Sequence, residues 1–305
     1  MTATRSHRDG TLLAIGAYLI WGLFPVYWRQ LSGIAPLQLI GHRIAWSFIL
    51  LAALVGLQGR VRVFAAVLDR HAALTYVAAA LLISVNWFAY VWAVTRELIV
   101  EASLGYYINP LFSVLLGVVL FGERLRAMQW VPILIAAAGV VYLTVTLGAF
   151  PWLAVLLATT FGLYGAVKKT APLGPLFGLA TETGLLFLPA VGYLVYCEMT
   201  GRGAFLHSSI AESLMMMGGG VITAVPLLLF AGAASRVPLT TIGLLQYLTP
   251  TLQFLIGVFV YHEDLPTPRL IGFGLVWVAL AAFWLEGLLV RFHRPAGGIG
   301  RSART

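Results

Sequence analysis

Charged residues are scarce in this chain. Of its 305 residues, 19 are Lys or Arg and 11 are Asp or Glu, which is 10%, whereas soluble domains carry roughly a quarter. The apolar share is 60%, against about 45–50% in an ordinary soluble domain. So few charges could not solvate the outside of a globule, and so much apolar surface could not be hidden inside one. The sequence therefore excludes water as the main solvent of the chain.

Residues that build disulfides, metal sites and nucleotide sites are also missing. The chain has one cysteine, Cys197, which excludes a disulfide framework and a cysteine-based metal site. The histidines lack the spacing of metal ligands, and no glycine-rich phosphate loop stands between a strand and a helix. The net charge of +8 comes largely from arginines between apolar runs, which membrane topology explains better than nucleic acid. We therefore expect no cofactor, no metal and no nucleic-acid partner.

Long apolar stretches, by contrast, fill most of the chain. A helix needs about 20 apolar residues to cross a bilayer. These stretches are apolar on all sides, as membrane helices are, and they lack the alternation of β-barrel strands. We predict an all-α integral membrane protein with ten transmembrane helices, at residues 11–29, 36–56, 73–94, 102–121, 127–147, 150–167, 175–196, 213–234, 239–261 and 269–290.

Lys and Arg are unevenly divided between the two sides of these predicted helices. With ten helices both termini lie on one side, and that side collects fourteen of the cationic residues while the other holds four. Cytoplasmic loops carry the excess of Lys and Arg in membrane proteins. We therefore expect a multi-pass protein of the cytoplasmic (inner) membrane, surrounded by the lipid bilayer, with both termini in the cytoplasm.

The chain matches itself at an offset of 140 residues. Residues 93–125 align with 233–265 without a gap, and ten of these positions are identical. The identical pairs include Tyr107/Tyr247, Pro110/Pro250 and Glu123/Glu263. Each half then holds five helices, so the second half enters the membrane upside down. We predict two inverted five-helix repeats, residues 1–148 and 149–305, which is the architecture of alternating access; duplication without transport is the other interpretation.

Several strings in both halves resemble a known family. The strings include Ala17-Tyr18-Leu19-Ile20-Trp21-Gly22, His42-Arg43, Glu101-Ala102-Ser103-Leu104-Gly105-Tyr106, Gly122-Glu123-Arg124, Tyr164-Gly165, Glu182-Thr183 and Gln246-Tyr247. The chain resembles the drug/metabolite transporter superfamily from end to end, within it the EamA-type ten-helix branch, and within that the RarD group. The resemblance implies export of small metabolites, including amino acids and aromatic or cationic drugs.

Arg43 is a charged residue inside a predicted helix. Such residues are costly in a bilayer, and they face the protein interior or a water-filled cavity. An offset of 139, anchored by Pro36/Pro175, places Glu182 opposite Arg43. We expect Arg43 and Glu182, with His42 beside them, to form an intramembrane pair or a gate that exchanges partners. A static pair, or Arg43 reaching toward the outer interface, is the alternative. Glu182 is also the one carboxylate deep enough to couple transport to protons.

Prolines and polar aromatic residues gather within the predicted helices. A proline frees the carbonyl four residues earlier, and in lipid that carbonyl needs a partner or a cavity. We expect hinges at Pro25, Pro110, Pro226 and Pro250. Aromatic and amide groups near these prolines suit aromatic or amphipathic cargo, through stacking and cation–π contact. The candidate substrate-binding residues are Trp21, Asn86, Tyr90, Tyr106, Asn109, Tyr164, Gln246 and Tyr247. An interfacial belt or plain packing is the alternative for any single aromatic residue.

Three classes of function compete for this pattern. A membrane enzyme needs reactive groups clustered at one depth, and a channel needs a charged ring or a carbonyl filter; the sequence displays neither. We predict a secondary active transporter, not an enzyme, that exports small aromatic or neutral amino acids or related amphipathic metabolites by alternating access. A multidrug or cationic-toxicant exporter is the alternative. We expect a central cavity lined by predicted helices 1, 3, 4, 6, 8 and 9. The sequence does not set the oligomeric state, and a monomer meets these expectations.

Reporter fusions test the predicted orientation. Because both termini are expected in the cytoplasm, green fluorescent protein fused after Thr305 should fluoresce, and alkaline phosphatase fused there should be inactive. The same two reporters fused after Gly201, between predicted helices 7 and 8, should give the reverse pattern. Termini on different faces would contradict both the ten-helix count and the inverted repeat.

Overall fold

The chain folds into a bundle of helices. The computed structural model describes residues 2–59, 69–95, 99–147, 150, 152–262 and scattered residues between 267 and 285, and these contain helices and no strand. Seven helices within the described residues are long and apolar enough to cross a membrane. They are Ser6–Leu31, Pro36–Leu57, Arg70–Tyr90, Ala127–Thr146, Pro175–Met199, Ile210–Ala234 and Leu239–Val260. Shorter apolar helices lie at Ile108–Phe121 and Leu270–Ala279. The predicted all-α membrane fold is confirmed.

Most of the predicted spans are single helices. These are α3 (Pro36–Leu57), α5 (Arg70–Thr95), α6 (Ile99–Phe121), α7 (Ala127–Leu147), α8 (Trp152–Thr170), α9 (Pro175–Met199) and α10 (Ile210–Ala234). Local sequence explains several of their starts. Pro36 and Pro175 lie in the first turn of their helices, where no N–H is needed. Ser209 accepts a hydrogen bond from the backbone N–H of Glu212, whose carboxylate accepts one from the N–H of Ser209, and this capping box begins α10. Half of the predicted span 269–290 lies outside the described residues.

Two predicted spans are interrupted rather than continuous. The first consists of α1 (Thr2–Gly22), α2 (Phe24–Trp28) and a 3-10 turn (Arg29–Leu31). The ninth consists of α11 (Leu239–Gln246), α12 (Leu248–Leu255) and a π-helical turn (Ile256–Val260). Pro25 and Pro250 lie in the first turns of α2 and α12, because a residue without an N–H is accommodated there. Pro110 and Pro226, by contrast, lie inside helices that continue past them.

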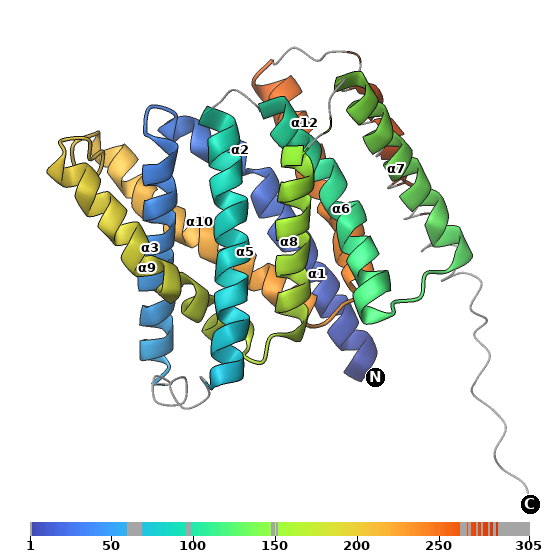
Figure 1. Cartoon of the computed structure of the whole chain (residues 1–305), viewed down its shortest axis with the longest axis horizontal. Coiled ribbons are helices and arrows are strands. Elements are labelled where there is room, and N and C mark those ends of the chain that lie inside the picture. The colour runs from blue at the N-terminus through green and yellow to red at the C-terminus, as the bar shows by residue number, and fades with distance from the viewer. Residues whose placement is uncertain are drawn as a thin grey trace, which may run out of the picture.

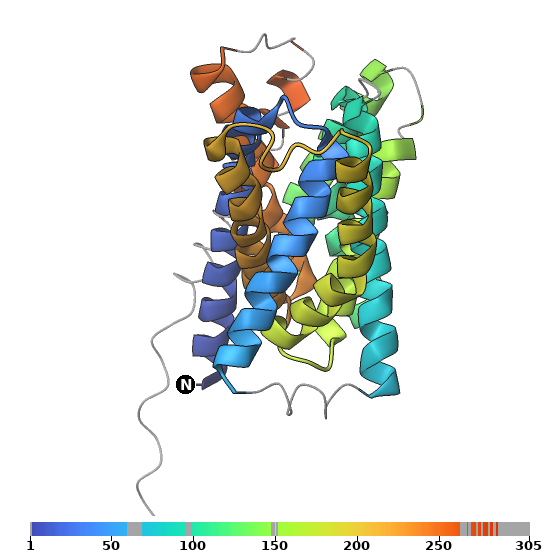
Figure 2. The ribbon, with the colours of Figure 1, turned by 90° about the vertical axis from the view of Figure 1, so that its left-hand side faces the viewer.

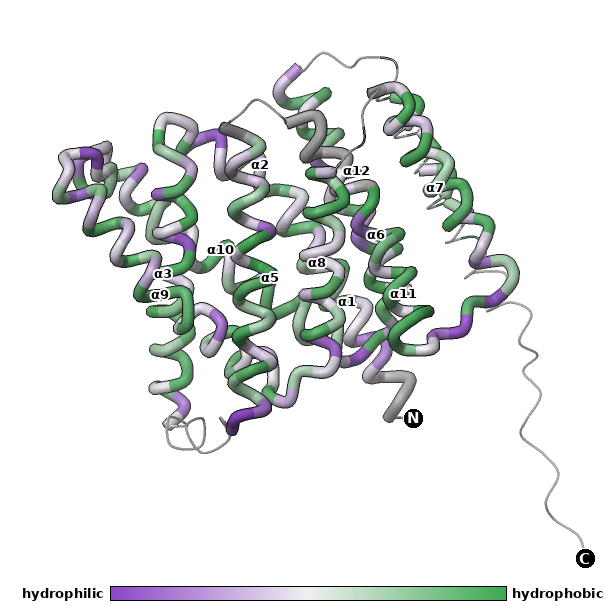
Figure 3. Tube along the Cα trace, viewed as in Figure 1, coloured by the Kyte–Doolittle hydropathy of each residue, from purple (hydrophilic) through white to green (hydrophobic). Residues whose placement is uncertain are grey.

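The helices lie side by side and cross the molecule from one end to the other, with α7, α9 and α10 inclined to the upright α3, α5 and α8 (Figures 1 and 2). We call the end of the bundle at which α1 begins the N-terminal face, and the other end the opposite face. α3 packs between α9 and α10, α8 packs between α5 and α6, and α1 packs against α10, α11 and α12. Hydrophilic residues gather at helix ends and connections, and the middle of the bundle is mostly hydrophobic (Figure 3). This banding is what a bilayer requires.

The largest buried core lies in the half of the bundle near the N-terminal face. It contains the fully buried rings of Tyr18, Tyr164 and Phe230, together with small residues of α1 and α10. α8 also ends at this face. Lys169, in its last turn, donates a hydrogen bond to the carbonyl of Val237 in the α10–α11 connection. α1 therefore leaves the N-terminal face and α8 runs toward it.

A glycine in α10 tests how closely the helices pack. A Cβ atom at Gly220 would lie 2.6 Å from the backbone carbon of Trp46 in α3, and Ser47 donates a hydrogen bond to the Gly220 carbonyl at this contact. Gly220→Ala should therefore lower the free energy of unfolding by about 1–3 kcal/mol, since two backbones must move apart. The measurement is chemical or thermal unfolding of the purified protein in detergent.

The matched control is Gly192→Ala in α9, where an added Cβ meets nothing within 4 Å. Removing a glycine from a helix interior should leave stability unchanged or raise it by up to about 1 kcal/mol. Equal destabilisation by both variants would contradict the close α3–α10 contact.

Candidate functional site

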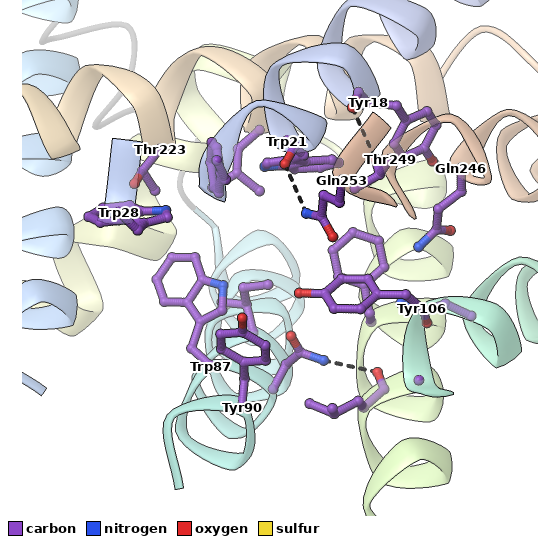
Figure 4. Close-up of a pocket in the computed structure, with 18 of the residues that line it drawn as sticks. Tyr18, Trp21, Trp28, Trp87, Tyr90, Tyr106, Thr223, Gln246, Thr249 and Gln253 are labelled. Carbon is purple, nitrogen blue, oxygen red and sulfur yellow. Dashed lines mark hydrogen bonds between the residues drawn. The ribbon is translucent and has the colours of Figure 1, made fainter. Parts of the chain in front are cut away.

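A cavity of about 300 Å³ lies among the helices. Its walls come from α1, α2, α3, α5, α6, α8, α10, α11 and α12. All the helices that the sequence predicts as lining contribute, and α3 adds one residue, Arg43. The volume is at the lower end of the range that holds small organic ligands. Aromatic side chains from several helices face the space (Figure 4).

Most of the predicted substrate-binding residues meet at this cavity. Those that line it are Trp21, Asn86, Tyr90, Tyr106, Asn109 and Gln246. Tyr164 and Tyr247 do not. Tyr164 stacks on Phe230 at 6.1 Å between ring centroids, in the buried core beyond the cavity. Tyr247 is 1% exposed and packs against Ala136 and Ala154. Both tyrosines are buried among other side chains. A tyrosine near a helix break can pack in a core as readily as it can line a binding cavity, so the sequence alone does not distinguish the two.

The lining residues that the sequence analysis missed include Trp28, Thr223 and Gln253. Thr223 and Gln253 are polar residues inside apolar helices, and this isolation was the available signal. The Gln253 side-chain amide donates a hydrogen bond of 3.2 Å to the carbonyl of Trp21, which is the carbonyl that Pro25 leaves without a helical donor. A polar side chain from α12 thus donates to the backbone carbonyl that the break in the first span leaves free (Figure 4).

Other polar side chains tie helices together at the cavity wall. The Asn86 amide donates to the carbonyl of Leu157 and to the hydroxyl of Thr160, both at 2.9 Å, and so joins α5 to α8. The Thr249 hydroxyl donates to the carbonyl of Tyr18 at 2.9 Å and joins α12 to α1. These bonds fix the wall, because backbone and side-chain polar groups within a bilayer must be satisfied inside the protein.

The predicted Arg43–Glu182 pair is absent from the structure, and this prediction is wrong for the conformation described. Arg43 lines the cavity, and its Nε donates to the Thr223 hydroxyl at 2.9 Å. Glu182 lies elsewhere, with its carboxylate on Lys168. His42 points away from the cavity, and its ring lies 5.1 Å from the ring of Phe205. The offset of 139 pairs the two positions in sequence, but in the structure Arg43 lies at the cavity and Glu182 lies beside the last turn of α8.

Glu182 forms a buried ion pair that the sequence analysis did not predict. Lys168 Nζ lies 2.6 Å from Glu182 Oε1, and both side chains are 2% exposed. The Tyr164 hydroxyl donates to the other carboxylate oxygen at 3.0 Å. The rings of Tyr76 and Tyr164 lie 5.5 and 5.8 Å from the ammonium. Lys168 was counted among the loop charges that set orientation, but it lies in the last turn of α8 and is not a loop residue.

Several contacts join the helices between the cavity and the N-terminal face. Tyr18, Tyr164 and Phe230 form a continuous ring contact, with the Lys168–Glu182 pair alongside it. Nearer the face, the Glu123 carboxylate accepts hydrogen bonds from the backbone N–H groups at the start of α11, those of Leu239 and Thr240, at 2.7 and 2.9 Å. Lys169 lies 3.4 Å from the same carboxylate. A helix N-terminus favours an anionic partner, so Glu123 holds the α6–α7 connection against α11.

Nothing in the described part of the chain could serve as a metal centre, since no three His, Cys, Asp or Glu side chains come together there. The cavity instead offers aromatic faces, amide groups and one guanidinium. Groups of this kind can stack on a ring and form hydrogen bonds with an organic molecule.

Comparisons with known proteins give related sequences along most of the chain. Residues 8–145 match the model of the EamA-like transporter family. The protein RarD of Streptomyces exfoliatus is 42% identical over 291 residues, which are 94% of this chain and 92% of that protein. The protein RarD of Escherichia coli K12 is 35% identical over 92% of this chain and 95% of its own length. An uncharacterized transporter of Vibrio cholerae is 40% identical over 97% of both chains.

A solved crystal structure has the same fold. It matches with a TM-score of 0.67 and 19% sequence identity, over 92% of this chain and 98% of that chain. At this identity the match shows the fold alone.

Breaking the buried ion pair should destabilise the bundle strongly. Lys168→Met leaves the Glu182 carboxylate buried without its cation, which should lower the free energy of unfolding by about 3–5 kcal/mol. The double variant Lys168→Met/Glu182→Leu removes both charges and should recover most of that loss. The measurement is the free energy of unfolding, in detergent, of the wild type, the single variant and the double variant. If the double variant is as unstable as the single one, Lys168 does not stabilise the protein by neutralising the Glu182 carboxylate.

The control is the exposed pair of Glu198 and His207, whose side chains are 53% and 63% exposed. Glu198→Gln should change stability by less than about 1 kcal/mol, because exposed ion pairs are screened by solvent.

Proposed function

Because this chain belongs to the RarD group of the EamA-like transporter family, we propose that it exports small aromatic or neutral amino acids, or related amphipathic metabolites, by alternating access. The family makes it a multi-pass membrane transporter and not an enzyme. Cargo, direction and mechanism are the parts that we propose. Export and location in the inner membrane follow the resemblance and the predicted excess of cationic residues at the N-terminal face.

The aromatic cavity is the observation that carries the proposed cargo. Trp21, Trp28 and Trp87 line it, together with Tyr90 and Tyr106. Tyr90 and Tyr106 pack edge to face at 6.3 Å, and ring faces of this kind bind planar apolar groups by offset or edge-to-face contact. A small amphipathic molecule with a ring fits both the volume and the lining.

The packing of the helices supports two inverted halves, residues 1–148 and 149–305. If spans one to five correspond to spans six to ten, then α1 against α10 should have a counterpart in α8 against α5. Likewise α6 against α8 should have a counterpart in α11 and α12 against α1. Both contacts exist, and α1 and α8 run in opposite directions. Inverted halves give two related conformations, one open to each side.

The contacts near the N-terminal face support alternating access in particular. The cavity residues of α2, of the start of α3 and of the end of α5 lie toward the opposite face. The layers beneath them, from the Tyr164–Phe230 stack to the cap of Glu123 on α11, separate the cavity from the N-terminal face. We infer that these contacts separate in the alternate conformation, with Pro25, Pro110, Pro226 and Pro250 as proposed hinge positions.

Counterflow in proteoliposomes tests this function. Vesicles preloaded with unlabelled L-phenylalanine should take up labelled L-phenylalanine faster than empty vesicles, because a carrier returns faster when loaded and a channel shows no such acceleration. Trp87→Ala, which removes a ring from the cavity wall, should reduce the counterflow rate by about tenfold, the effect of losing roughly 1.4 kcal/mol of binding.

Phe88→Ala is the matched control for that variant. Phe88 is the next residue of the same helix, is 60% exposed and does not line the cavity. Its replacement should leave counterflow at the wild-type rate. Equal uptake by loaded and empty vesicles across a panel of aromatic and neutral amino acids would overturn the proposed transport.

A further inference from the structure

Arg43 is the one charged residue among the described residues that line the cavity. Its guanidinium carbon lies 5.0 Å from the ring centroid of Trp28 and 4.9 Å from that of Trp87, which is within cation–π distance of both indole rings. Its Nε is held by the Thr223 hydroxyl. The side chain is therefore positioned by three neighbours, each on a different helix.

Among the residues that the structure describes, none accepts a hydrogen bond from the remaining donors of this guanidinium. An arginine carries five N–H groups, and only Nε has a hydrogen-bond partner among the described residues. No carboxylate in the described part of the chain lies within ion-pair distance of Arg43. An uncompensated charge inside a membrane bundle is costly, and the two terminal nitrogens form a fork that matches a carboxylate in bidentate geometry. The missing partner is an anion.

Another part of the cavity contains hydrogen-bond acceptors that lack a donor. Tyr18, Asn109 and Gln246 each line the cavity and each have a buried side-chain oxygen without a hydrogen-bond partner. Asn109 and Gln246 are 6% and 5% exposed, and both unpartnered atoms are amide oxygens, which accept hydrogen bonds and cannot donate them. Unsatisfied buried acceptors are rare. In Figure 4, Gln246 and Tyr18 lie at the other side of the cavity from Trp28 and Thr223.

We propose that the cavity selects aromatic carboxylates that carry a hydrogen-bond donor at the far end: Arg43 binds the carboxylate, the aromatic wall packs on the ring, and the amide oxygens of Asn109 and Gln246 accept from the donor. This inference rests on the proposed transport function and narrows its cargo. It makes Arg43 a specificity-determining residue and excludes organic cations as preferred cargo, because a cation next to an unpaired guanidinium is repelled.

Matched probes separate anionic from cationic recognition. Binding of 3-phenylpropionate and of 3-phenylpropylamine to the purified protein in detergent is measured by microscale thermophoresis at low salt. The two probes share a ring and a chain and differ in the sign of the end group. The wild-type protein should bind the carboxylate at least about tenfold more tightly than the amine, the margin of a charge-assisted hydrogen bond.

Variants of Arg43 assign that preference to the guanidinium. Arg43→Gln should weaken the binding of 3-phenylpropionate by about 10- to 100-fold and abolish the preference for it over the amine. Arg43→Lys keeps the positive charge but loses the fork of two nitrogens, so its affinity for 3-phenylpropionate should lie between those of the wild type and Arg43→Gln. Arg29→Gln is the charge-matched control, since Arg29 lies on the ring of Tyr261 outside the cavity; it should bind as the wild type does.

A second pair of probes tests the far end. 3-(4-Hydroxyphenyl)propionate adds one O–H donor to 3-phenylpropionate, so it should bind the wild-type protein about three- to tenfold more tightly. The double variant Asn109→Leu/Gln246→Leu should lose this difference and bind the two carboxylates with equal affinity. Circular dichroism and the thermal midpoint of each variant confirm that it is folded.

The outcomes separate this inference from the proposed function. If the amine binds the wild-type protein as well as the carboxylate does, or if neither carboxylate binds, the inference is overturned, whatever counterflow shows. If selective binding is found but counterflow is absent, the inference stands and the proposed transport fails. A hydroxyl effect that survives in the Asn109/Gln246 double variant overturns the assignment of the far end.

Discussion

Every polar group in the middle of this bundle must find its partner inside the protein, and this constraint organises the rest of the structure. A bilayer offers no water to a buried amide or charge. The break at Pro25 persists because Gln253 reaches across from α12 to the carbonyl of Trp21. The Lys168–Glu182 pair persists because each charge neutralises the other and Tyr164 occupies the second carboxylate oxygen. Because these partners come from segments far apart in sequence, satisfying the polar groups also fixes which helices lie together.

The same constraint gives meaning to the groups that remain unsatisfied. In the described residues of the cavity, the guanidinium fork of Arg43 and the amide oxygens of Asn109 and Gln246 lack partners, while polar groups of the wall around them are paired. A structural role would favour pairing them as well, since an unpaired buried group opposes folding. Because these groups line a cavity with the volume of a small molecule, we propose that a ligand supplies their partners. The guanidinium donates hydrogen bonds and the amide oxygens accept them, so the ligand would bind in one orientation.

The sequence predicted the helices well, because composition and apolar length are local properties. Trp21, Asn86 and Gln246, which it proposed as substrate-binding residues, come together at one cavity, and their binding role stays a prediction. It failed where the answer depends on tertiary distance. Glu182 was matched with Arg43 by offset, yet its partner Lys168 is only fourteen residues away in sequence and was taken for a loop charge. Whether a cation at a helix end turns inward depends on packing against the neighbouring helix, which a one-dimensional pattern does not contain.

The separation of the two charged sites follows from what each must do. Lys168 and Glu182 are paired near the N-terminal face, where they hold α8 to α9, and separating them would leave two buried charges without partners. Arg43 is a single charge beside the space, and it would lose its role if Glu182 neutralised it. The layer near the N-terminal face and the cavity therefore use different charged groups, because the ion pair that joins α8 to α9 does not include the cation beside the cavity. In the transport cycle that we propose, the contacts of the first would close that face, and the second would recognise the cargo.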